Sequence, residues 1–325
     1  MSLPLPEPVP SAMPIACFGE CMVELQPQGV GLWRQAFAGD TCNTAVYLAR
    51  LLAGRGPSVC WAMGTGEDQF AAGMREFWAA EGLDLSLLRD VPRGRSGLYA
   101  IHLDARGERH FNYWRDTSAA RAYFDTPDMA ETPLEHAAAQ LQGLHFSAIS
   151  LAILSPGGRA RLMACAQAIR QRGGWVSFDT NYRPALWANS AEALHAIRSA
   201  MAVSDRVLVS MDEWQALSGA PDEAHALAAL RALQCPELVV KRGPCHTWVS
   251  QQGAEVQVAE VAPVGQPVDT TAAGDAFAAG YLAARTHGRN PREAAQAGNR
   301  LAAAVVMYPG AIIPLAVMPD LGLGR

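Results

Sequence analysis

The segment VDTTAAGDAFAAGYLA, residues 268–283, carries the most informative pattern in the chain. A polar turn is followed by the small residues Ala272, Ala273 and Gly274, and Asp275 then begins a helix. Small residues at a helix start let backbone N–H groups approach an anion closely, and the helix dipole adds a positive partial charge. The segment therefore predicts an anion site with a carboxylate beside it. The alternative is that Asp275 only caps the helix, since an Asp in the first turn is favourable by itself.

Outward from this segment, short apolar strands alternate with helices along the chain. This alternation predicts a mostly parallel sheet with helices on both faces. One helix is predicted to begin at Asp40 or Thr41, either of which can cap it. Such sheets bind ligands at the carboxyl ends of their strands, so we expect the chemistry in the loops that follow strands. The other predicted elements are strands at 15–18, 58–63, 144–149, 175–178, 206–209, 238–241 and 247–250 and helices at 70–80, 159–172, 191–201 and 222–233.

Residues 97–115, GLYAIHLDARGERHFNYWR, differ in texture from the rest of the chain. Two β-rich runs flank an Asp-Ala-Arg-Gly turn, which predicts a hairpin. Because side chains alternate along a strand, Phe111, Tyr113 and Arg115 are expected on one face. With partner strands near residues 20–38, the hairpin is predicted to form a small sheet outside the α/β body.

The composition limits the classes to which the protein can belong. Half of its 325 residues are hydrophobic and 18% are charged, which supplies enough apolar material for a large core. The net charge of −5 argues against a broadly basic nucleic-acid surface. Seven cysteines without paired spacing fit neither a disulfide framework nor a zinc site. We therefore expect a soluble cytoplasmic protein with reduced thiols.

Neither a secretory signal nor a membrane span is expected. Residues 1–14 contain alternating prolines without a basic and then apolar order, which predicts a disordered tail. The longest apolar stretch, 301–318, is interrupted by Pro309, Gly310 and Pro314, whereas a membrane span needs about twenty uninterrupted apolar residues. The chain also has no Gly-Lys-Ser/Thr triplet and no protein-kinase signature.

Two segments together resemble the signatures of a known family. DTTAAGD followed by AFAAGYL, residues 269–282, is similar to the C-terminal signature of ribokinase-like, or PfkB-type, carbohydrate kinases. AGDTCNTAVYLARLLA, residues 38–53, resembles the N-terminal signature, and the glycine-punctuated loop at 64–73 matches a glycine-rich loop of the family. The resemblance covers about residues 14–315.

The resemblance implies a fold and a pair of cosubstrates. The fold is α/β, a three-layer α/β/α arrangement with a mostly parallel central sheet and a small β-sheet lid. The kinase domain would span 15–325, with lid strands from about 20–38 and 97–125. ATP would be the phosphoryl donor and Mg²⁺ the metal, and a monovalent-cation requirement stays open. A homo-oligomer formed through the lid also stays open, because exposed sheet edges can pair.

Shorter segments resemble the subgroup of this family that phosphorylates 2-keto-3-deoxygluconate. The resemblance implies transfer of a phosphoryl group from ATP to the terminal hydroxyl of this small acidic sugar, with no nucleic-acid or membrane partner. Alternatives are a fructokinase, a nucleoside kinase or a non-catalytic sugar-binding relative. The segments that carry the resemblance are GECMVEL (19–25), GDTCNTAVYLAR (39–50), NYWR (112–115), FDTNYRP (178–184), VVKRG (239–243) and TTAAGD (270–275).

The same resemblance implies which residues bind the sugar. Arg115 is expected to bind the sugar carboxylate, because a guanidinium offers a planar fork to a carboxylate. Arg183 is expected to bind either that carboxylate or the transferred phosphate. Each group also has an ordinary alternative, namely a helix cap, cross-strand packing or a polar turn before Pro184. The predicted sugar-binding residues are Gly39, Asp40, Asn43, Tyr99, Tyr113, Arg115, Arg183 and Asp275.

The resemblance also implies the catalytic and nucleotide-binding residues. Asp275 would be the general base, and the amides of Ala272, Ala273 and Gly274 would form an anion hole. Glu213 is expected to act on the metal indirectly, although Ser210 stands where the family has an Asn in this motif. The predicted nucleotide-binding residues are Asn181, Lys241, Arg242, Gly243, Ala272, Gly274 and Asn299.

Two further departures from the family pattern bear on these roles. His246 occupies the place of a second glycine after Gly243, which affects the nucleotide loop. The early sugar-binding Asp of ribokinases has no clear counterpart after Gly19. The second departure weakens the case for a ribose substrate.

Overall fold

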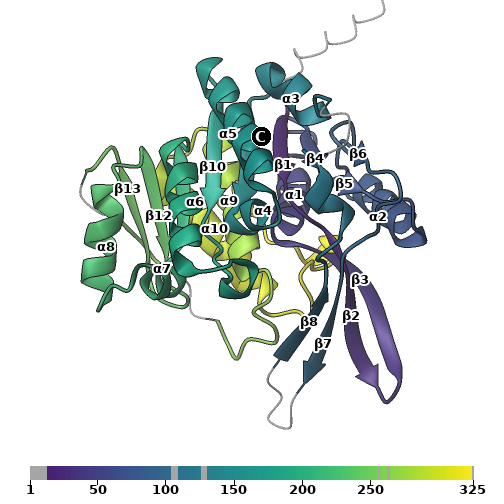
Figure 1. The fold of residues 1–325 in the computed structure, drawn as a ribbon. Helices are drawn as coiled ribbons and strands as arrows, with labels where there is room; N and C mark the ends of the chain where they lie inside the picture. The colour runs from purple at the N-terminus through teal and green to yellow at the C-terminus, as the bar shows by residue number, and fades with distance from the viewer. Residues whose placement is uncertain (1–12, 104–108, 126–129, 255–256, 262–263, 324–325) are drawn as a thin grey trace, which may run out of the picture.

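The computed structural model of the chain describes residues 13–103, 109–125, 130–254, 257–261 and 264–323. Most of the tail predicted at 1–14 and the expected hairpin turn lie outside these ranges. Within them, the chain forms a large sheet between layers of helices and a smaller sheet beside it (Figure 1).

A large, mostly parallel sheet forms the centre of the described part of the chain. Its eight strands are ordered β14-β13-β12-β11-β10-β9-β1-β4. The strands from β12 to β4 run parallel, whereas β13 and β14 are antiparallel additions at one edge. This arrangement confirms the predicted sheet. The strands are β1 (Ile15–Phe18), β4 (Val59–Ala62), β9 (Gly143–Ser147), β10 (Trp175–Asp179), β11 (Arg206–Ser210), β12 (Glu237–Lys241), β13 (Thr247–Gln251) and β14 (Gln257–Ala259).

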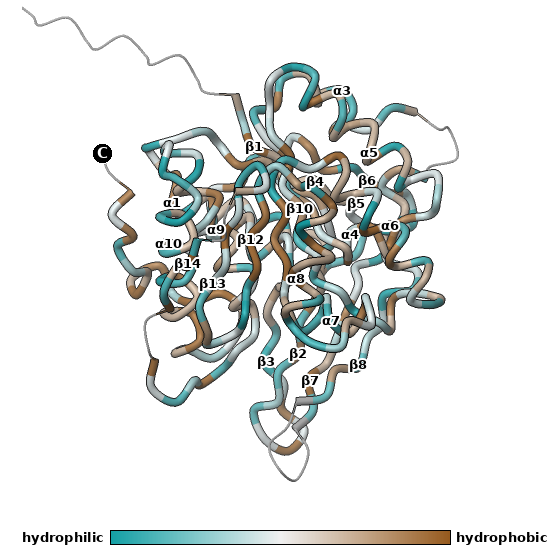
Figure 2. Tube along the Cα trace, turned by 90° about the vertical axis from the view of Figure 1, so that its left-hand side faces the viewer, coloured by the Kyte–Doolittle hydropathy of each residue, from teal (hydrophilic) through white to brown (hydrophobic). Residues whose placement is uncertain are grey.

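The parallel strands are almost continuously apolar because both faces of the sheet are covered. Every residue of β1 and β4 is buried. Figure 2 shows hydrophobic strands such as β10 and β12 enclosed by more polar helices. Because the strands point the same way, their carboxyl ends meet at one edge, where polar side chains can converge.

Helices cover the two faces of the large sheet (Figure 1). Helices α1, α9 and α10 pack together on one face, and α4, α5 and α6 lie on the other. The helices are α1 (Asp40–Leu52), α2 (Gln69–Ala80), α3 (Pro133–Ala137), α4 (Ala148–Ala152), α5 (Pro156–Gln171), α6 (Ser190–Ala202), α7 (Met211–Ser218), α8 (Glu223–Ala232), α9 (Ala273–Thr286) and α10 (Pro291–Val305). Short 3-10 turns lie at Ala119–Ala122, Ala138–Gln140, Pro184–Leu186 and Leu315–Val317.

Two local predictions from the sequence are wrong. The strand predicted at 144–149 ends at Ser147, because Ser147 and Ser150 exchange hydrogen bonds that begin helix α4. Neither Asp40 nor Thr41 caps α1, since Gly39 holds the cap position and Asp40 lies in the first turn. The Asp40 carboxylate is therefore available to residues outside its own helix.

A second sheet projects from the body at the lower right of Figure 1. Its strand order is β3-β2-β7-β8, with β2 parallel to β7 and the outer pairs antiparallel. Its strands are β2 (Met22–Gly29), β3 (Leu32–Ala38), β7 (Leu98–Leu103) and β8 (Arg109–Trp114), and a separate pair is formed by β5 (Gly64–Thr65) and β6 (Arg89–Asp90). After β8 the described chain to Asp125 contains the first 3-10 turn rather than another strand.

One face of the small sheet is turned toward the body. Met22, Ala38, Tyr99 and Ile101 are buried there against Ala311. This cluster is separate from the continuous core of the α/β body. The small sheet also contacts the body through Val23, which belongs to the continuous core, and through Leu25, Phe37 and Leu98, which pack against that core.

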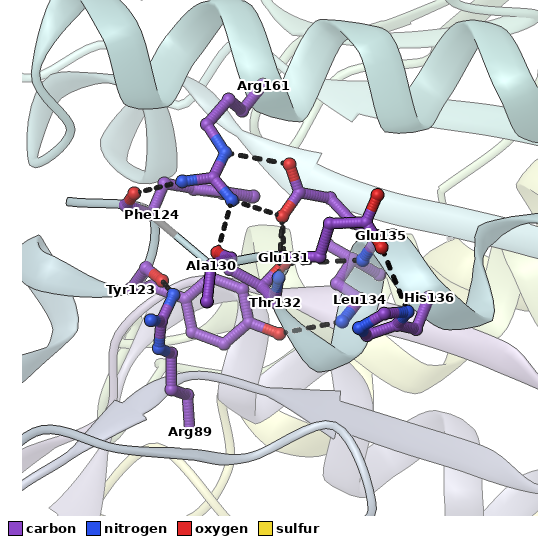
Figure 3. Close-up of polar contacts among 10 residues, drawn as sticks. All are labelled: Arg89, Tyr123, Phe124, Ala130, Glu131, Thr132, Leu134, Glu135, His136 and Arg161. Carbon is purple, nitrogen blue, oxygen red and sulfur yellow. Dashed lines mark hydrogen bonds and ion pairs between the residues drawn. The ribbon is translucent and has the colours of Figure 1, made fainter. Parts of the chain in front are cut away.

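The connection from the small sheet back to the large sheet is fastened to α5 (Figure 3). Arg161 of α5 forms a two-pronged ion pair with Glu135 of α3, with N–O distances of 2.7 and 2.6 Å. Arg161 also donates hydrogen bonds to the carbonyl oxygens of Phe124 and Ala130. The chain that leaves the small sheet is therefore anchored to the body at a defined place.

Candidate active site

The polar side chains predicted from distant parts of the sequence meet at the carboxyl edge of the parallel strands. Strand β10 ends at Asp179 and β12 ends at Lys241, while α1 begins at Asp40 and α9 begins at Ala273. The predicted clustering of these segments is therefore present, although their individual roles are not tested by position alone.

Asp275 lies in the first turn of α9, against the first turns of α1. The Asn43 side-chain amide donates a hydrogen bond to Asp275 Oδ2 at 2.8 Å, and the Thr44 hydroxyl donates to the Asp275 carbonyl oxygen at 3.2 Å. Burial raises the pKa of the Asp275 carboxyl to about 8, and the negative charge of Asp40 adds to the rise. The raised pKa makes the carboxylate form of Asp275 a stronger proton acceptor than an ordinary aspartate.

The start of α9 is shaped by small residues. Ala272 holds the cap position with φ +60°, a left-handed conformation that an Ala side chain disfavours. A Cβ atom on Gly274 would lie 3.4 Å from Lys241 Nζ, so the Lys241 ammonium lies directly beside the backbone of this turn. A helix N-terminus and a cation thus face the same place, which is favourable for a phosphate group.

A buried ion pair lies next to this turn. Lys241 Nζ is 2.7 Å from Asp179 Oδ2, and both side chains are almost completely buried. The backbone N–H of Asn181 donates to Asp179 Oδ1 at 3.2 Å, and the Asn181 side chain donates to Asp40 Oδ2 at 2.9 Å. Hydrogen bonds therefore connect the end of β12 to the start of α1 through the loop after β10.

The same loop carries Arg183, whose side chain is about half exposed. Its guanidinium pairs with Glu213, and the Glu213 carboxylate also accepts the backbone N–H of Tyr182 at 3.0 Å. Partial burial alone would lower the pKa of Arg183, but the nearby carboxylates of Glu213, Asp275 and Asp40 raise it overall. Arg183 is thus an accessible cation close to Asp275.

Gly39 is required by the close approach of two backbones. A Cβ atom there would lie 1.9 Å from the Glu20 carbonyl oxygen, so no larger residue fits without movement. Asn43 donates its backbone N–H to the Gly39 carbonyl at 2.7 Å. The glycine therefore lets the segment between β1 and β2 lie against the start of α1.

The small sheet contributes an aromatic surface. The register places Tyr99 opposite Tyr113, and their ring centroids are 5.7 Å apart. Tyr113 remains about half exposed, whereas Tyr99 is buried and donates its hydroxyl hydrogen bond to Glu24. Arg115 lies 5.9 Å from the centroid of the Tyr113 ring, which confirms that these two side chains share a face.

Arg115 is buried rather than solvated. It forms an ion pair with Glu20, and the side chains are 5% and 1% exposed. Within the described residues, Arg115 Nε and Glu20 Oε1 are buried without hydrogen-bond partners. Buried polar groups are normally satisfied, so Arg115 Nε and Glu20 Oε1 retain unused hydrogen-bonding capacity.

Two predicted nucleotide-binding residues have other partners. Arg242 pairs with Glu223 at 2.6 Å and lies over the Trp248 ring, 4.0 Å from its centroid. Asn299 accepts a hydrogen bond from the Thr247 hydroxyl at 2.9 Å and donates to the Glu260 carbonyl at 3.1 Å. Both side chains thus hold β13 and β14 to their neighbours.

Gly243 follows β12 with φ +56°, a left-handed conformation that favours glycine. The Cys245 backbone N–H donates to the Arg242 carbonyl oxygen at 3.0 Å, which closes a tight turn. This turn lies next to Lys241, and its binding of a nucleotide stays a prediction.

Several residues at this edge were not singled out from the sequence. Asp179, Glu20 and Glu24 occur in segments quoted for their resemblance, but their partners could not be predicted without the fold. His145 on β9 is another, with its Nδ1 3.2 Å from the Ser177 hydroxyl and its pKa lowered by burial to about 4. A histidine in an apolar strand was the only available signal for it.

A separate cavity of about 790 Å³ lies at the other end of β13, beside the start of α10. Gln251, which lines it, pairs with Glu237 at the opposite end of β12 from Lys241. This cavity is therefore distinct from the polar cluster at the carboxyl edge.

The chain matches a family of sugar kinases along most of its length. Residues 14–318 match the family described as "pfkB family carbohydrate kinase". The chain belongs to this family. Its fold is accordingly ribokinase-like, and the protein is a carbohydrate kinase.

Individual relatives and a solved structure agree with this assignment. This PfkB kinase is 41% identical to the 2-dehydro-3-deoxygluconokinase of Dickeya dadantii (strain 3937), covering 94% of this chain and 98% of that protein. It is 38% identical to the 2-dehydro-3-deoxygluconokinase of Escherichia coli (strain K12), with the same coverage. The fructokinase of Vibrio cholerae O395, solved with fructose, ADP and calcium ion bound, has a TM-score of 0.80 at 27% identity and covers 96% of this chain and 98% of its own.

Possible metal ligands and membrane-spanning helices were sought among the described residues of this PfkB kinase. In the part of the chain that the structure describes, no group of three His, Cys, Asp or Glu side chains could hold a metal ion. Mg²⁺ is commonly bound by substrate phosphates and one or two carboxylates, so a protein cage is not needed. Among the described helices, none is both long and apolar enough to cross a membrane.

Proposed function

We propose that this PfkB kinase transfers the γ-phosphoryl group of ATP to the terminal hydroxyl of 2-keto-3-deoxy-D-gluconate, also named 2-dehydro-3-deoxygluconate. The product would be 2-keto-3-deoxy-6-phosphogluconate, together with ADP. The observation that carries the reaction type is the Asp275 carboxyl at the start of α9, beside the Lys241 ammonium. The two 2-dehydro-3-deoxygluconokinases that match nearly the whole chain support the choice of sugar.

In the proposed reaction the terminal hydroxyl oxygen of the sugar attacks the γ-phosphorus. The bond between that phosphorus and the oxygen bridging to the β-phosphate breaks, and ADP leaves with the electron pair. The hydroxyl proton passes to the Asp275 carboxylate, whose raised pKa favours its acceptance. Asn43, which donates to Asp275 Oδ2, leaves the other carboxylate oxygen to face the hydroxyl.

Charge stabilisation would come from the start of α9 and from Lys241. The loose transition state of phosphoryl transfer spreads negative charge over the γ-phosphoryl oxygens, so positioning and electrostatics supply most of the catalysis. The backbone N–H groups after Ala272 and the Lys241 ammonium face that charge. A Mg²⁺ ion bound with ATP would neutralise the β- and γ-phosphates, and Glu213 would act on it only through the loop that it holds.

The acidic end of the sugar needs a cation. Arg183 is the accessible one, because its side chain is about half exposed and close to Asp275. Arg115 is buried on Glu20 but retains an unpartnered Nε among the described residues, so it can donate one further hydrogen bond to a carboxylate. Tyr113, which interacts with the charges of both arginines, would add an aromatic surface to them.

The small sheet would act as the lid that covers the sugar. Its face with Tyr99 and Tyr113 is the one that packs on the body at Ala311. Closure would exclude water, which otherwise accepts the phosphoryl group in place of the sugar.

A fructokinase is the second candidate, favoured by the similarity to the Vibrio cholerae enzyme. An ADP-release assay with 2-keto-3-deoxygluconate, fructose, ribose and adenosine as acceptors separates the candidates. We expect kcat/KM for 2-keto-3-deoxygluconate to exceed that for each neutral acceptor by at least about tenfold, which corresponds to about 1.4 kcal/mol. A higher kcat/KM for fructose would identify the protein as a fructokinase. Equal kcat/KM values for all acceptors would contradict the proposed substrate.

A further inference from the structure

Asp179 has no assigned role, yet its carboxylate connects two sides of the site. It ends β10 and is 5% exposed. One carboxylate oxygen is 2.7 Å from Lys241 Nζ, and the other accepts the Asn181 backbone N–H at 3.2 Å. Both oxygens are therefore used, each by a different segment of the chain.

The two partners of Asp179 lead to opposite ends of the proposed reaction. Lys241 lies beside Gly274 in the turn where the transferred phosphoryl group is expected. Asn181 donates its side-chain amide to Asp40 Oδ2 at 2.9 Å, at the start of α1 where the sugar hydroxyls are expected. One buried carboxylate thus fixes the distance between the phosphate side and the sugar side.

A lysine needs such a partner at this place. Its ammonium group is carried by four flexible methylene groups, and a buried cation without a counter-ion is costly. Without Asp179, Lys241 would lose its charge or turn away from Gly274. A displacement of about 1 Å at a reacting group can cost a factor of about 100 in rate.

We propose that Asp179 is a positioning residue for phosphoryl transfer, which holds Lys241 against the start of α9 and the Asn181 loop against Asp40. The proposal rests on the proposed kinase reaction but not on which sugar accepts the phosphoryl group. Each oxygen of Asp179 has a partner within the chain, Lys241 for one and Asn181 for the other, so the proposal has Asp179 act through these two residues.

Three charged or titratable groups face the Asp179–Lys241 pair, namely His145 from β9, Asp40 from α1 and Asp275 from α9. Arg183, from the loop after β10, also interacts with Asp275. His145 stays neutral near pH 7 because burial lowers its pKa to about 4. The charge of Asp179 raises the pKa of Asp275, and the charge of Lys241 lowers it.

The opposite effects of Asp179 and Lys241 on the pKa of Asp275 distinguish a positioning role from a merely structural one. Asp179→Asn should shift the acidic limb of the kcat/KM pH profile to lower pH, and Lys241→Met should shift it to higher pH. Each variant should lower kcat by about 10- to 100-fold. The double variant should lose little more than the worse single variant, because the two residues act as one unit.

Glu237→Gln is the matched control. Glu237 is buried at the opposite end of β12 and pairs with Arg285 at 2.8 Å, so this variant breaks a comparable ion pair away from the site. It should reduce thermal stability while leaving kcat within about twofold and the pH profile unmoved. Two results would overturn the proposal. One is a loss of kcat in the double variant equal to the product of the two single losses, and the other is a shift of the acidic limb in the same direction in both single variants.

Calorimetric titration with ATP in the absence of any acceptor separates this inference from the identity of the sugar. We expect the Kd for ATP to rise at least about threefold in Asp179→Asn and in Lys241→Met, and to stay unchanged in Glu237→Gln. If Asp179→Asn does not fold, the same two measurements on Lys241→Met test the proposal. An ATP Kd and an acidic limb of Lys241→Met equal to those of Glu237→Gln would then refute the role of the Asp179–Lys241 pair.

Discussion

At the scale of single residues, the proposed mechanism assigns the chemical step to Asp275. Asp275→Asn should lower kcat by roughly 10²–10⁴, the usual contribution of a general base, with little change in the KM for the sugar. Steady-state ADP release measures both constants. Asp222, the N-cap of α8, provides the control for a purely structural cap, and Asp222→Asn should leave kcat within about twofold. Near-wild-type turnover of Asp275→Asn would leave Asp275 with only a capping role.

The raised pKa of Asp275 also predicts how stability depends on pH. The folded protein retains a proton on Asp275 up to about pH 8, whereas an unfolded chain releases it near pH 4. The folded state therefore binds more protons between these values, and the Asp275 contribution to the free energy of unfolding falls as pH rises from about 4 to 8.

Asp275→Asn should remove this dependence on pH. The free energy of unfolding of the variant should therefore exceed that of the wild type at pH 8, and the difference should be smaller at pH 5. Urea unfolding of the ligand-free proteins at both pH values measures the difference. An equal difference at the two pH values would show that the pKa of Asp275 is not raised.

Ala272 stores backbone strain at the start of α9. Its φ of +60° is unfavourable for alanine, so Ala272→Gly should raise the free energy of unfolding by about 0.5–1 kcal/mol. Ala273 lies inside the helix, where glycine is unfavourable, and Ala273→Gly should lower it by a similar amount. Thermal unfolding of the two ligand-free variants compares these neighbouring positions. Shifts of the unfolding temperature in the same direction for both variants would contradict the left-handed conformation of Ala272.

At the scale of elements, the proposed function predicts that the small sheet and the body share the recognition of an acidic sugar. Arg115→Lys keeps a positive charge beside Glu20 but removes the planar fork. We therefore expect KM for 2-keto-3-deoxygluconate to rise at least about tenfold, while KM for a neutral acceptor such as fructose changes by less than about threefold. Equal changes for both acceptors would show that Arg115 serves the fold and not the carboxylate.

The sequence predicted the elements better than the partners of individual side chains. Apolar runs located the strands of the parallel sheet and most of the long helices, but not the start of α10, since burial on both faces leaves a clear pattern. The short helix α4 was missed because its first turn depends on Ser147 and Ser150 rather than on periodicity. Arg242 pairs with Glu223, a carboxylate from another element, and no spacing in the sequence predicts that contact.

The candidate site was predictable as a set of segments but not as a network. The segments around Asp40, Asn181, Lys241 and Asp275 were expected at one edge, because strand ends of a parallel sheet converge there. The ion pair of Lys241 with Asp179 joins residues that are 62 positions apart, and it becomes visible only once β10 and β12 are placed. Long-range side-chain pairs of this kind are properties of the fold.

At the scale of the whole molecule, two sheets divide the work. In the proposed reaction, the large sheet would gather the groups that act on phosphate, and the small sheet would bring aromatic and cationic side chains to the sugar. The outer face of the small sheet leaves Trp33 and Trp114 about half exposed. A homo-oligomer formed through this sheet stays a prediction that the size of the protein in solution would test.

The division of work predicts a kinase that selects an acidic sugar and phosphorylates its terminal carbon. The most direct measurement is a competition in which equal concentrations of 2-keto-3-deoxygluconate and fructose share limiting ATP, with the products identified by ³¹P nuclear magnetic resonance. The predicted result is at least about ten times more phosphate on the terminal CH₂ oxygen of 2-keto-3-deoxygluconate than on fructose. A product mixture dominated by fructose phosphate or by free phosphate would contradict the proposed function.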